Sequence, residues 1–135
     1  MVSVEDLRAT FRTAFSHLKP GGVFLTFTEE TPGCFKQNST TFEARRKNDV
    51  EIVLIQNNYD PDLRDTSYEA TLVYLIRRQG RLKIHTDRHL CGLFKLKTWL
   101  DLLRDEGFRV KQLKFKQPEI LRGKNYPLWV CTKPF

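Results

Sequence analysis

At 135 residues, 40% of them hydrophobic and 29% charged, the chain has the size and composition of one globular domain with its own core. No apolar run approaches the roughly 20 residues of a membrane helix, and the first residues, MVSVEDLRATF, lack the basic start and apolar stretch of a signal peptide, so we expect a cytoplasmic protein without a membrane segment. Lysine and arginine number 23 against 16 acidic residues, and the formal charge of +7 favours anionic partners.

The basic residues are scattered along the chain. They form short clusters at 45–47, at 77–78 and between 111 and 116, and no long basic tract. Short clusters are typical of solvated loop and strand faces. We therefore do not expect nucleic acid to be the partner.

The three cysteines, Cys34, Cys91 and Cys131, are far apart and odd in number. No C-x-x-C pair occurs, so the sequence predicts neither a zinc ribbon nor a disulfide framework. Free thiols are usual in a reducing compartment, which agrees with the expected cytoplasmic location.

The chain opens with the pattern of a helix followed by a strand. Apolar residues recur at three- and four-residue spacing between residues 3 and 17, which predicts an amphipathic helix with Ser3 as its N-cap. The sequence KPGG at 19–22 then ends the helix and turns the chain. The run Val23–Phe27 is almost wholly apolar and predicts a strand buried on both faces.

The middle of the chain predicts an antiparallel layer. Residues 28–49 are polar and contain turn signals, so we expect a long loop there. Residues 50–55 predict a strand, and residues 68–77 and 81–89 predict a hairpin around Gln79 and Gly80. Three successive strands with short connections favour antiparallel pairing. We treat residues 50–90 as an antiparallel insertion within a single domain of residues 1–135.

The last third predicts a second helix and two strands. Apolar residues at 96, 99, 100 and 103 share one helical face, and Gly107 is placed to end that helix. Residues 108–115 alternate apolar and basic side chains as a strand does, a loop is expected at 116–125, and residues 128–131 predict a final strand. Trp99 and Trp129 are expected in the core. The fold class is α/β, or α+β for the chain taken by itself.

The order of these parts resembles the C-terminal half of class I S-adenosylmethionine-dependent methyltransferases. One motif is HLKPGG at 17–22, which is similar to the turn that leads to the fifth strand in that superfamily. The other is HLCGLFKLKTWLDLLRDEGFRV at 89–110, which is similar to the small-molecule branch that includes aminosugar N-methyltransferases. The resemblance covers nearly the whole chain. It implies part of a Rossmann-like sheet, an antiparallel β insertion, two main helices and a small-molecule methyl acceptor.

The half that binds the cofactor in this family has no counterpart in the sequence. The family's glycine-rich turn and its acidic ribose-binding residue are missing, and no G-x-G occurs among the 7 glycines. Without such positions, backbone N–H groups have no close approach to a nucleotide. We therefore expect S-adenosylmethionine to be the cofactor of the full-length family, and we expect no cofactor for this chain alone. The chain would then be a fragment, a shortened gene product or half of a split enzyme.

A half-sheet leaves one strand edge unpaired. In the family's strand order, the strand at 23–27 lies beside a fourth strand that is missing here. An apolar unpaired edge invites pairing with another chain. The sequence therefore predicts a homo-oligomer, formed through that edge or through the antiparallel insertion.

The resemblance also implies where an acceptor would bind. In the family, substrate contacts come from the end of the fifth strand and from the antiparallel layer, and the matching positions are Thr28, Glu29, Glu30, Tyr59, Arg88 and His89. A base whose pKa lies near the working pH keeps the acceptor unprotonated. We take Glu29, Glu30, Tyr59 and Arg88 as candidate substrate-binding residues and His89 as the candidate catalytic residue. The glutamates could equally be a charged loop start, and Tyr59 could be a turn aromatic.

His85, Asp87 and His89 alternate along one expected strand, so their side chains share one face. Histidine and carboxylate are suitable metal ligands. However, such rows are common in exposed hairpins, so we predict a solvated strand face and no metal site.

The sequence is compatible with three functions. The first is the C-terminal region of a small-molecule methyltransferase, inactive by itself, whose basic charge would suit an anionic acceptor such as a nucleotide-linked sugar. The second is a non-catalytic binding or dimerisation module, for which the aromatic and basic residues of FRVKQLKFK at 108–116 are typical of a nucleic-acid surface. The third is an independent enzyme that uses His89 with Glu29 or Glu30. Whether the chain is an enzyme is left open.

Overall fold

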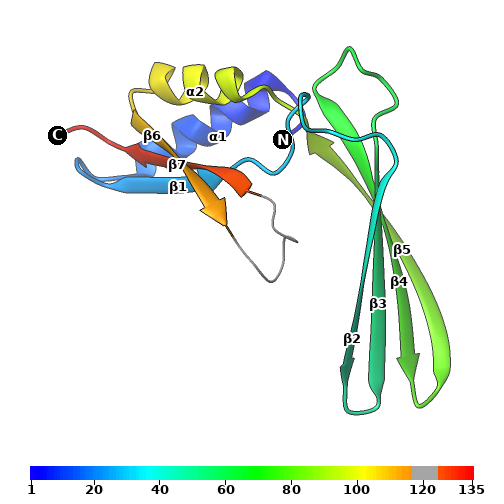
Figure 1. Ribbon diagram of the computed structural model, residues 1–135. Helices are drawn as coiled ribbons and strands as arrows, with labels where there is room; N and C mark the ends of the chain where they lie inside the picture. Colours follow the sequence, from blue (N-terminus) through cyan, green and yellow to red (C-terminus); the bar gives the residue numbers. More distant parts are fainter. Residues whose placement is uncertain (117–124) are drawn as a thin grey trace. The chain divides into compact units, whose positions relative to one another are not determined.

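A computed structural model describes residues 1–116 and 125–135 (Figure 1). The chain divides into two compact units: unit 1 comprises residues 1, 3–34 and 93–135, and unit 2 comprises residue 2 and residues 35–92. None of the helices in the described part of the chain is long and apolar enough to cross a membrane.

Unit 1 is an antiparallel sheet with two helices on one face (Figure 1). Its helices are α1 (Val4–His17) and α2 (Leu96–Asp105). Its strands are β1 (Val23–Phe27), β6 (Arg109–Lys116) and β7 (Asn125–Thr132), in the spatial order β1-β7-β6. The strand β1 therefore lies at an edge and pairs with β7, which comes from the far end of the chain.

Both helices of unit 1 begin or end as the sequence predicts. The Ser3 hydroxyl accepts a hydrogen bond from the backbone N–H of Asp6 at 3.1 Å, and the Asp6 carboxylate accepts one from the N–H of Ser3 at 3.2 Å, which makes a capping box. Gly107 follows α2 with φ +99°, and a Cβ there would meet the ring of Phe15 at 3.2 Å. Glycine is thus required at this position by backbone conformation and by space.

The core of unit 1 lies between the helices and the covered face of the sheet. Trp129 is fully buried and Trp99 is 8% exposed, which confirms both as core residues. Their rings stack with an interplanar angle of 2° at 6.5 Å, and Phe11 packs against Trp99 at 5.4 Å. The cluster of buried residues consists of Leu7, Phe11, Phe94, Trp99, Leu102, Leu103, Phe108, Trp129 and Cys131.

Unit 2 is a four-stranded antiparallel meander of β2 (Ser39–Lys47), β3 (Val50–Tyr59), β4 (Ser67–Arg78) and β5 (Arg81–Gly92), in that spatial order (Figure 1). The turns at its closed end contain Asn48, Gln79 and Gly80, all with positive φ, which is typical of tight hairpin connections. Within these four strands, Tyr68 and Ala70 are the only buried residues.

The structure corrects two expectations from the sequence. Residues 39–47 form strand β2, not part of a loop, and pair with β3 from Ser39 opposite Asn58 to Lys47 opposite Val50. The sequence STTFEARRK gave no strand signal because nearly all of these side chains are exposed and polar. The strand β1 is not buried on both faces, since the helices cover only the side that carries Phe24 and Thr26. The loop expected at 116–125 falls largely on residues 117–124, outside the described residues.

Candidate functional site

The end of β1 is held by a buried hydrogen bond. Thr28, the residue after the strand, is 4% exposed and accepts a hydrogen bond from the Trp129 indole Nε1 at 2.9 Å. Its backbone N–H donates to the carbonyl of Pro127 at 3.0 Å. Because β7 holds both the side chain and the backbone of Thr28, the position of the chain at the carboxyl end of β1 is fixed.

Two carboxylates follow this fixed point. Glu29 is exposed and Glu30 is half-buried. Tyr126 is a buried residue of β7. Burial of the phenol raises the pKa of Tyr126, and the negative charges of Glu29 and Glu30 raise it further. The structure therefore brings both predicted glutamates together with a neutral tyrosine. Such a group can accept hydrogen bonds from hydroxyls or hold an amine.

In unit 2, the two candidate residues Tyr59 and Arg88 share one face of the sheet. Tyr59 lies opposite Glu69, and the Arg88 guanidinium forms an ion pair with the Glu69 carboxylate. Arg88 is two residues from Leu90, which also lies opposite Glu69, so the alternation of the strand places all these side chains on the same side.

His89 lies on the other face of the same sheet. Its Nε2 is 2.8 Å from the Asp87 carboxylate, which fixes the ring. The hydrogen bond with His89, helped by the N–H of Arg88, lowers the pKa of Asp87. His85 shares this face, but the described side chains contain no group of three or more histidine, cysteine or acidic residues that could hold a metal ion.

The candidate residues thus fall into three sets. Glu29 and Glu30 belong to unit 1, Tyr59 and Arg88 to one face of unit 2, and His89 to the opposite face of unit 2. Sequence reasoning did not find Tyr126 or Glu69. The register of β7 against β1 places Tyr126 just beyond the end of β1, and a sequence alone does not give this register.

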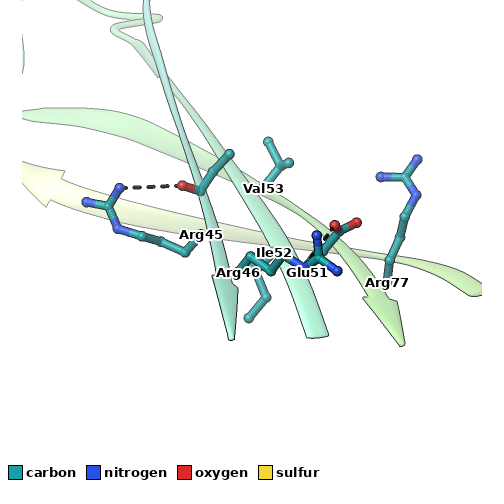
Figure 2. A pocket seen from close by; sticks show the side chains of 7 residues that line it. Arg45, Arg46, Glu51, Ile52, Val53 and Arg77 are labelled. Carbon is teal, nitrogen blue, oxygen red and sulfur yellow. Dashed lines mark hydrogen bonds and ion pairs between the residues drawn. The ribbon is translucent and has the colours of Figure 1, made fainter. Parts of the chain in front are cut away.

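A basic hollow lies near the closed end of unit 2, where Arg46 and Arg77 flank Glu51, and Arg45 at its rim points toward the Ala44 carbonyl (Figure 2). Its volume is about 240 Å³. Arg46 forms an ion pair with Glu51 at 3.6 Å, and Arg77 lies opposite Glu51 on β4. Two arginines beside one carboxylate leave an excess of positive charge, which can attract an anion.

The glycines nearest the start of β1 do not form a cradle for a nucleotide. A Cβ at Gly21 would meet the Phe135 ring at 2.7 Å, and one at Gly22 would meet the Lys19 carbonyl at 2.8 Å. The space that these glycines free is filled by the chain itself. The residues around this turn therefore do not fit S-adenosylmethionine.

Comparisons with known proteins identify the fold. No protein-family model and no curated protein sequence matches the chain. The structure of DesVI from Streptomyces venezuelae matches 98% of this chain and 52% of its own, with a TM-score of 0.82 and 20% identity. Similar matches are SAM-bound CalS10, an amino pentose methyltransferase from Micromonospora echinaspora involved in calicheamicin biosynthesis (98% and 52%, TM-score 0.79, 16% identity), and the sugar N-methyltransferase KedS8 from Streptoalloteichus sp. (98% and 51%, TM-score 0.78, 17% identity).

The chain therefore has the fold of a part of these methyltransferases and spans about half their length. The expected fold class, a partial methyltransferase sheet with an antiparallel β insertion and two main helices, is confirmed.

Proposed function

We propose that this chain is the acceptor-side half of an S-adenosylmethionine-dependent methyltransferase that acts on an amino sugar or a similar small molecule. The observation that carries the proposal is the match of 98% of the chain to half of CalS10 and half of KedS8, both sugar methyltransferases. A fold alone hosts many functions, so the site residues must supply the specific chemistry.

Those residues suit an amine acceptor. Methyl transfer to nitrogen requires a free lone pair on the acceptor and close alignment with the donor. Glu29 and Glu30 can hold the amine by charge and hydrogen bonding, while the neutral phenol of Tyr126 beside them can donate a hydrogen bond to a sugar oxygen. His89, whose ring is oriented by Asp87, is the candidate catalytic base that unit 2 supplies. Tyr59 and Arg88 remain candidate acceptor contacts, but they lie on the opposite face of unit 2 from His89 and form a separate set.

The cofactor is assigned to the part of the enzyme that this chain does not match. S-adenosylmethionine would supply the methyl group, and the turn at Gly21 and Gly22 does not fit it. We therefore propose that the chain by itself has no methyltransferase activity.

Calorimetric titration of the chain with S-adenosylmethionine and with its demethylated product tests this assignment. We expect no heat of binding for either. Binding with a Kd in the micromolar range would show that the chain has its own cofactor site. The acceptor assignment is tested by Glu29→Gln and Glu30→Gln in an enzyme that contains a cofactor-binding half; unchanged KM for the amino sugar would contradict it.

A second candidate function is a binding module for an anionic partner, favoured by the hollow between Arg45, Arg46 and Arg77. Binding of generic DNA or RNA that weakens steeply with added salt would support this function. An Arg46→Glu variant should then bind less well. Absence of binding at low salt would leave the methyltransferase half as the better proposal.

We also propose that the chain self-associates through unit 2. One face of its sheet carries an apolar row across the four strands, formed by Ala44, Val53, Leu75 and Ile84. Phe42 lies on the same face, two residues before Ala44 on β2. Phe42 is 64% exposed and Ile84 is 61% exposed. A row of exposed apolar side chains across a sheet is a usual basis for association.

A further inference from the structure

Basic residues that are separate in the sequence meet on one face at the closed end of unit 2. The two rows of side chains nearest the hairpin turns combine cations with aliphatic residues. In chain order they are Arg45, Lys47, Val50, Ile52, Ile76, Arg78, Arg81 and Lys83. We call this set the basic face. It lies on the opposite side of the sheet from the apolar row described above, because side chains alternate along each strand.

The cations occupy the margins of the basic face. Two lie on the edge strand β2, two lie on the edge strand β5, and Arg78 lies on β4 beside the turn. The aliphatic residues lie between these margins on β3 and β4. All the cations are exposed, whereas Ile52 is 38% exposed and the other two aliphatic residues are half-buried. Short β-branched side chains therefore form an apolar floor between two rows of long basic side chains.

Most of this positive charge is uncompensated within the described chain. Arg45 forms an ion pair with Glu43 at 3.4 Å, but the other cations of the basic face form none with a described residue. Arg78 lies directly opposite Arg81, and like charges in such a position destabilise a sheet. Glu51 does not relieve this repulsion, because it lies on the opposite face. An anionic partner would do so.

The dimensions of the basic face match an α-helix. The margins on β2 and β5 are separated by three strand spacings, or about 14 Å. An α-helix with its side chains is about 10–12 Å wide, so a helix above β3 and β4 fits between the two margins. Along each margin the two cations are two residues apart, about 7 Å, which is close to the helical pitch of about 5.4 Å. Carboxylates on successive turns of such a helix can therefore meet successive cations.

The apolar floor disfavours the other anionic partners. Single-stranded nucleic acid stacks its bases on aromatic side chains, and the basic face contains none. Phosphates would also leave the floor without an apolar contact. A membrane takes up apolar side chains that project from a surface, whereas these are shorter than the basic side chains around them. A polypeptide helix can cover the floor and neutralise both margins at once.

We propose that the basic face binds an α-helix of another polypeptide that carries an apolar stripe with acidic residues along both sides. The stripe covers the floor, and the two rows of carboxylates pair with the cations of β2 and β5. This is recognition of an amphipathic helix in a groove, with charge complementarity selecting the partner. The proposal concerns a partner outside the methyl-transfer reaction and does not depend on the proposed function.

The test uses a labelled synthetic peptide of about 18 residues, long enough to form a helix in water. It carries leucines at helical spacing and glutamates on both sides of them, and a second peptide has lysines in place of the glutamates. Fluorescence anisotropy with the full chain measures both dissociation constants at low salt. We expect a Kd in the micromolar range for the acidic peptide and no measurable binding of the basic peptide. In about 1 M salt, where charges are screened beyond about 3 Å, the acidic peptide should bind at least about tenfold more weakly.

Matched variants locate the binding surface. Lys47→Glu and Lys83→Glu each reverse a charge on one margin, and each should raise the Kd at least about tenfold. Lys36→Glu makes the same change at an exposed lysine of unit 2 outside the basic face and should leave the Kd unchanged. Ile52→Thr keeps the β-branched shape but makes the floor more polar, and should raise the Kd at least about threefold. Urea denaturation checks that each variant is as stable as the wild type.

The variants also separate binding from a purely protective role of the charges. Charged residues on edge strands prevent sheets from pairing edge to edge, and either sign of charge serves this purpose. A Kd that Lys83→Glu leaves unchanged would therefore overturn the proposal. Equal binding of the acidic and basic peptides would overturn it too, because only apolar adhesion would then remain. Duplex RNA or phosphatidylserine vesicles that bind more tightly than the acidic peptide would identify a nucleic acid or a membrane as the partner instead.

Discussion

The two units of this chain are stabilised in different ways. Unit 1 packs two helices on a sheet and buries nine residues in one cluster. Unit 2 has longer strands and more backbone pairing, yet its strands bury only Tyr68 and Ala70. Hydrogen bonds contribute a modest net free energy, whereas apolar burial is the main favourable term. Unit 2 therefore has less apolar burial to stabilise it than unit 1 has.

The largest expected effect is on the core of unit 1. Leu103→Ala removes a fully buried side chain and should lower the free energy of unfolding by about 3 kcal/mol. Leu82→Ala in unit 2, where the leucine is 44% exposed, should cost less than about 1 kcal/mol. Urea denaturation of both variants checks the difference. Equal losses would contradict the contrast between the units.

A pH dependence should distinguish the buried thiol of unit 1. Burial raises the pKa of Cys131 from 9.0 to about 11. Between these values the unfolded chain releases the thiol proton and the folded chain keeps it, so the free energy of unfolding falls as pH rises. The full loss is about 3 kcal/mol, at about 1.4 kcal/mol per pH unit between these two pKa values.

Urea denaturation of the wild type and Cys131→Ala between pH 8 and 11 measures this effect as the difference in slope. Cys34→Ala is the control, because Cys34 is an exposed thiol outside the core of unit 1. A wild-type slope that Cys131→Ala leaves unchanged would assign the pH dependence to other groups.

A charge placed in the apolar row of unit 2 should weaken self-association. Ile84→Glu places a charge in the apolar row and should raise the dimer dissociation constant about tenfold, equivalent to about 1.4 kcal/mol. Sedimentation equilibrium measures this constant, with Leu63→Glu as the control at an exposed leucine outside the row. A wild-type chain that remains monomeric at high concentration would exclude the proposed association.

The smallest effect concerns the exposed pair on β5. The hydrogen bond with His89 holds the pKa of Asp87 below its ordinary value, so its contribution to stability is present above the unfolded pKa and is lost as pH falls through the folded value. NMR titration of the Asp87 carboxyl should show a low midpoint that rises in His89→Gln. An unchanged midpoint would show that the pair does not persist in solution.

The elements that the sequence predicted are those whose signals are local. Helix α1 has its cap at Ser3 and one apolar stripe, and α2 has Gly107 at its end, so periodicity and caps were sufficient. Strand β2 was missed because its side chains face solvent, and its existence depends on pairing with β3. Exposure of one face of β1 depends on which other segments cover it, which no pattern within Val23–Phe27 records.

The candidate site shows the same division. Glu29 and Glu30 could be placed at a strand end from the sequence, and the structure brings them to Tyr126. Tyr126 belongs to β7 and lies about 100 residues further along the chain. Arg88 and His89 are adjacent in sequence but lie on opposite faces of unit 2, because a strand alternates its side chains. The pairing register of the strands therefore determines which candidate residues lie together, and the residue types alone do not give this register.

The pairing of β1 with β7 has a consequence for how the chain acquires its fold. Unit 2 consists of hairpins between neighbouring segments, which close quickly, whereas β1 must wait for β7, about 100 residues further along the chain. During synthesis at about 5–20 residues per second, α1 and β1 therefore spend several seconds without their final partner. In that interval the apolar residues Val23, Leu25 and Phe27 are most open to chaperones and to misassembly.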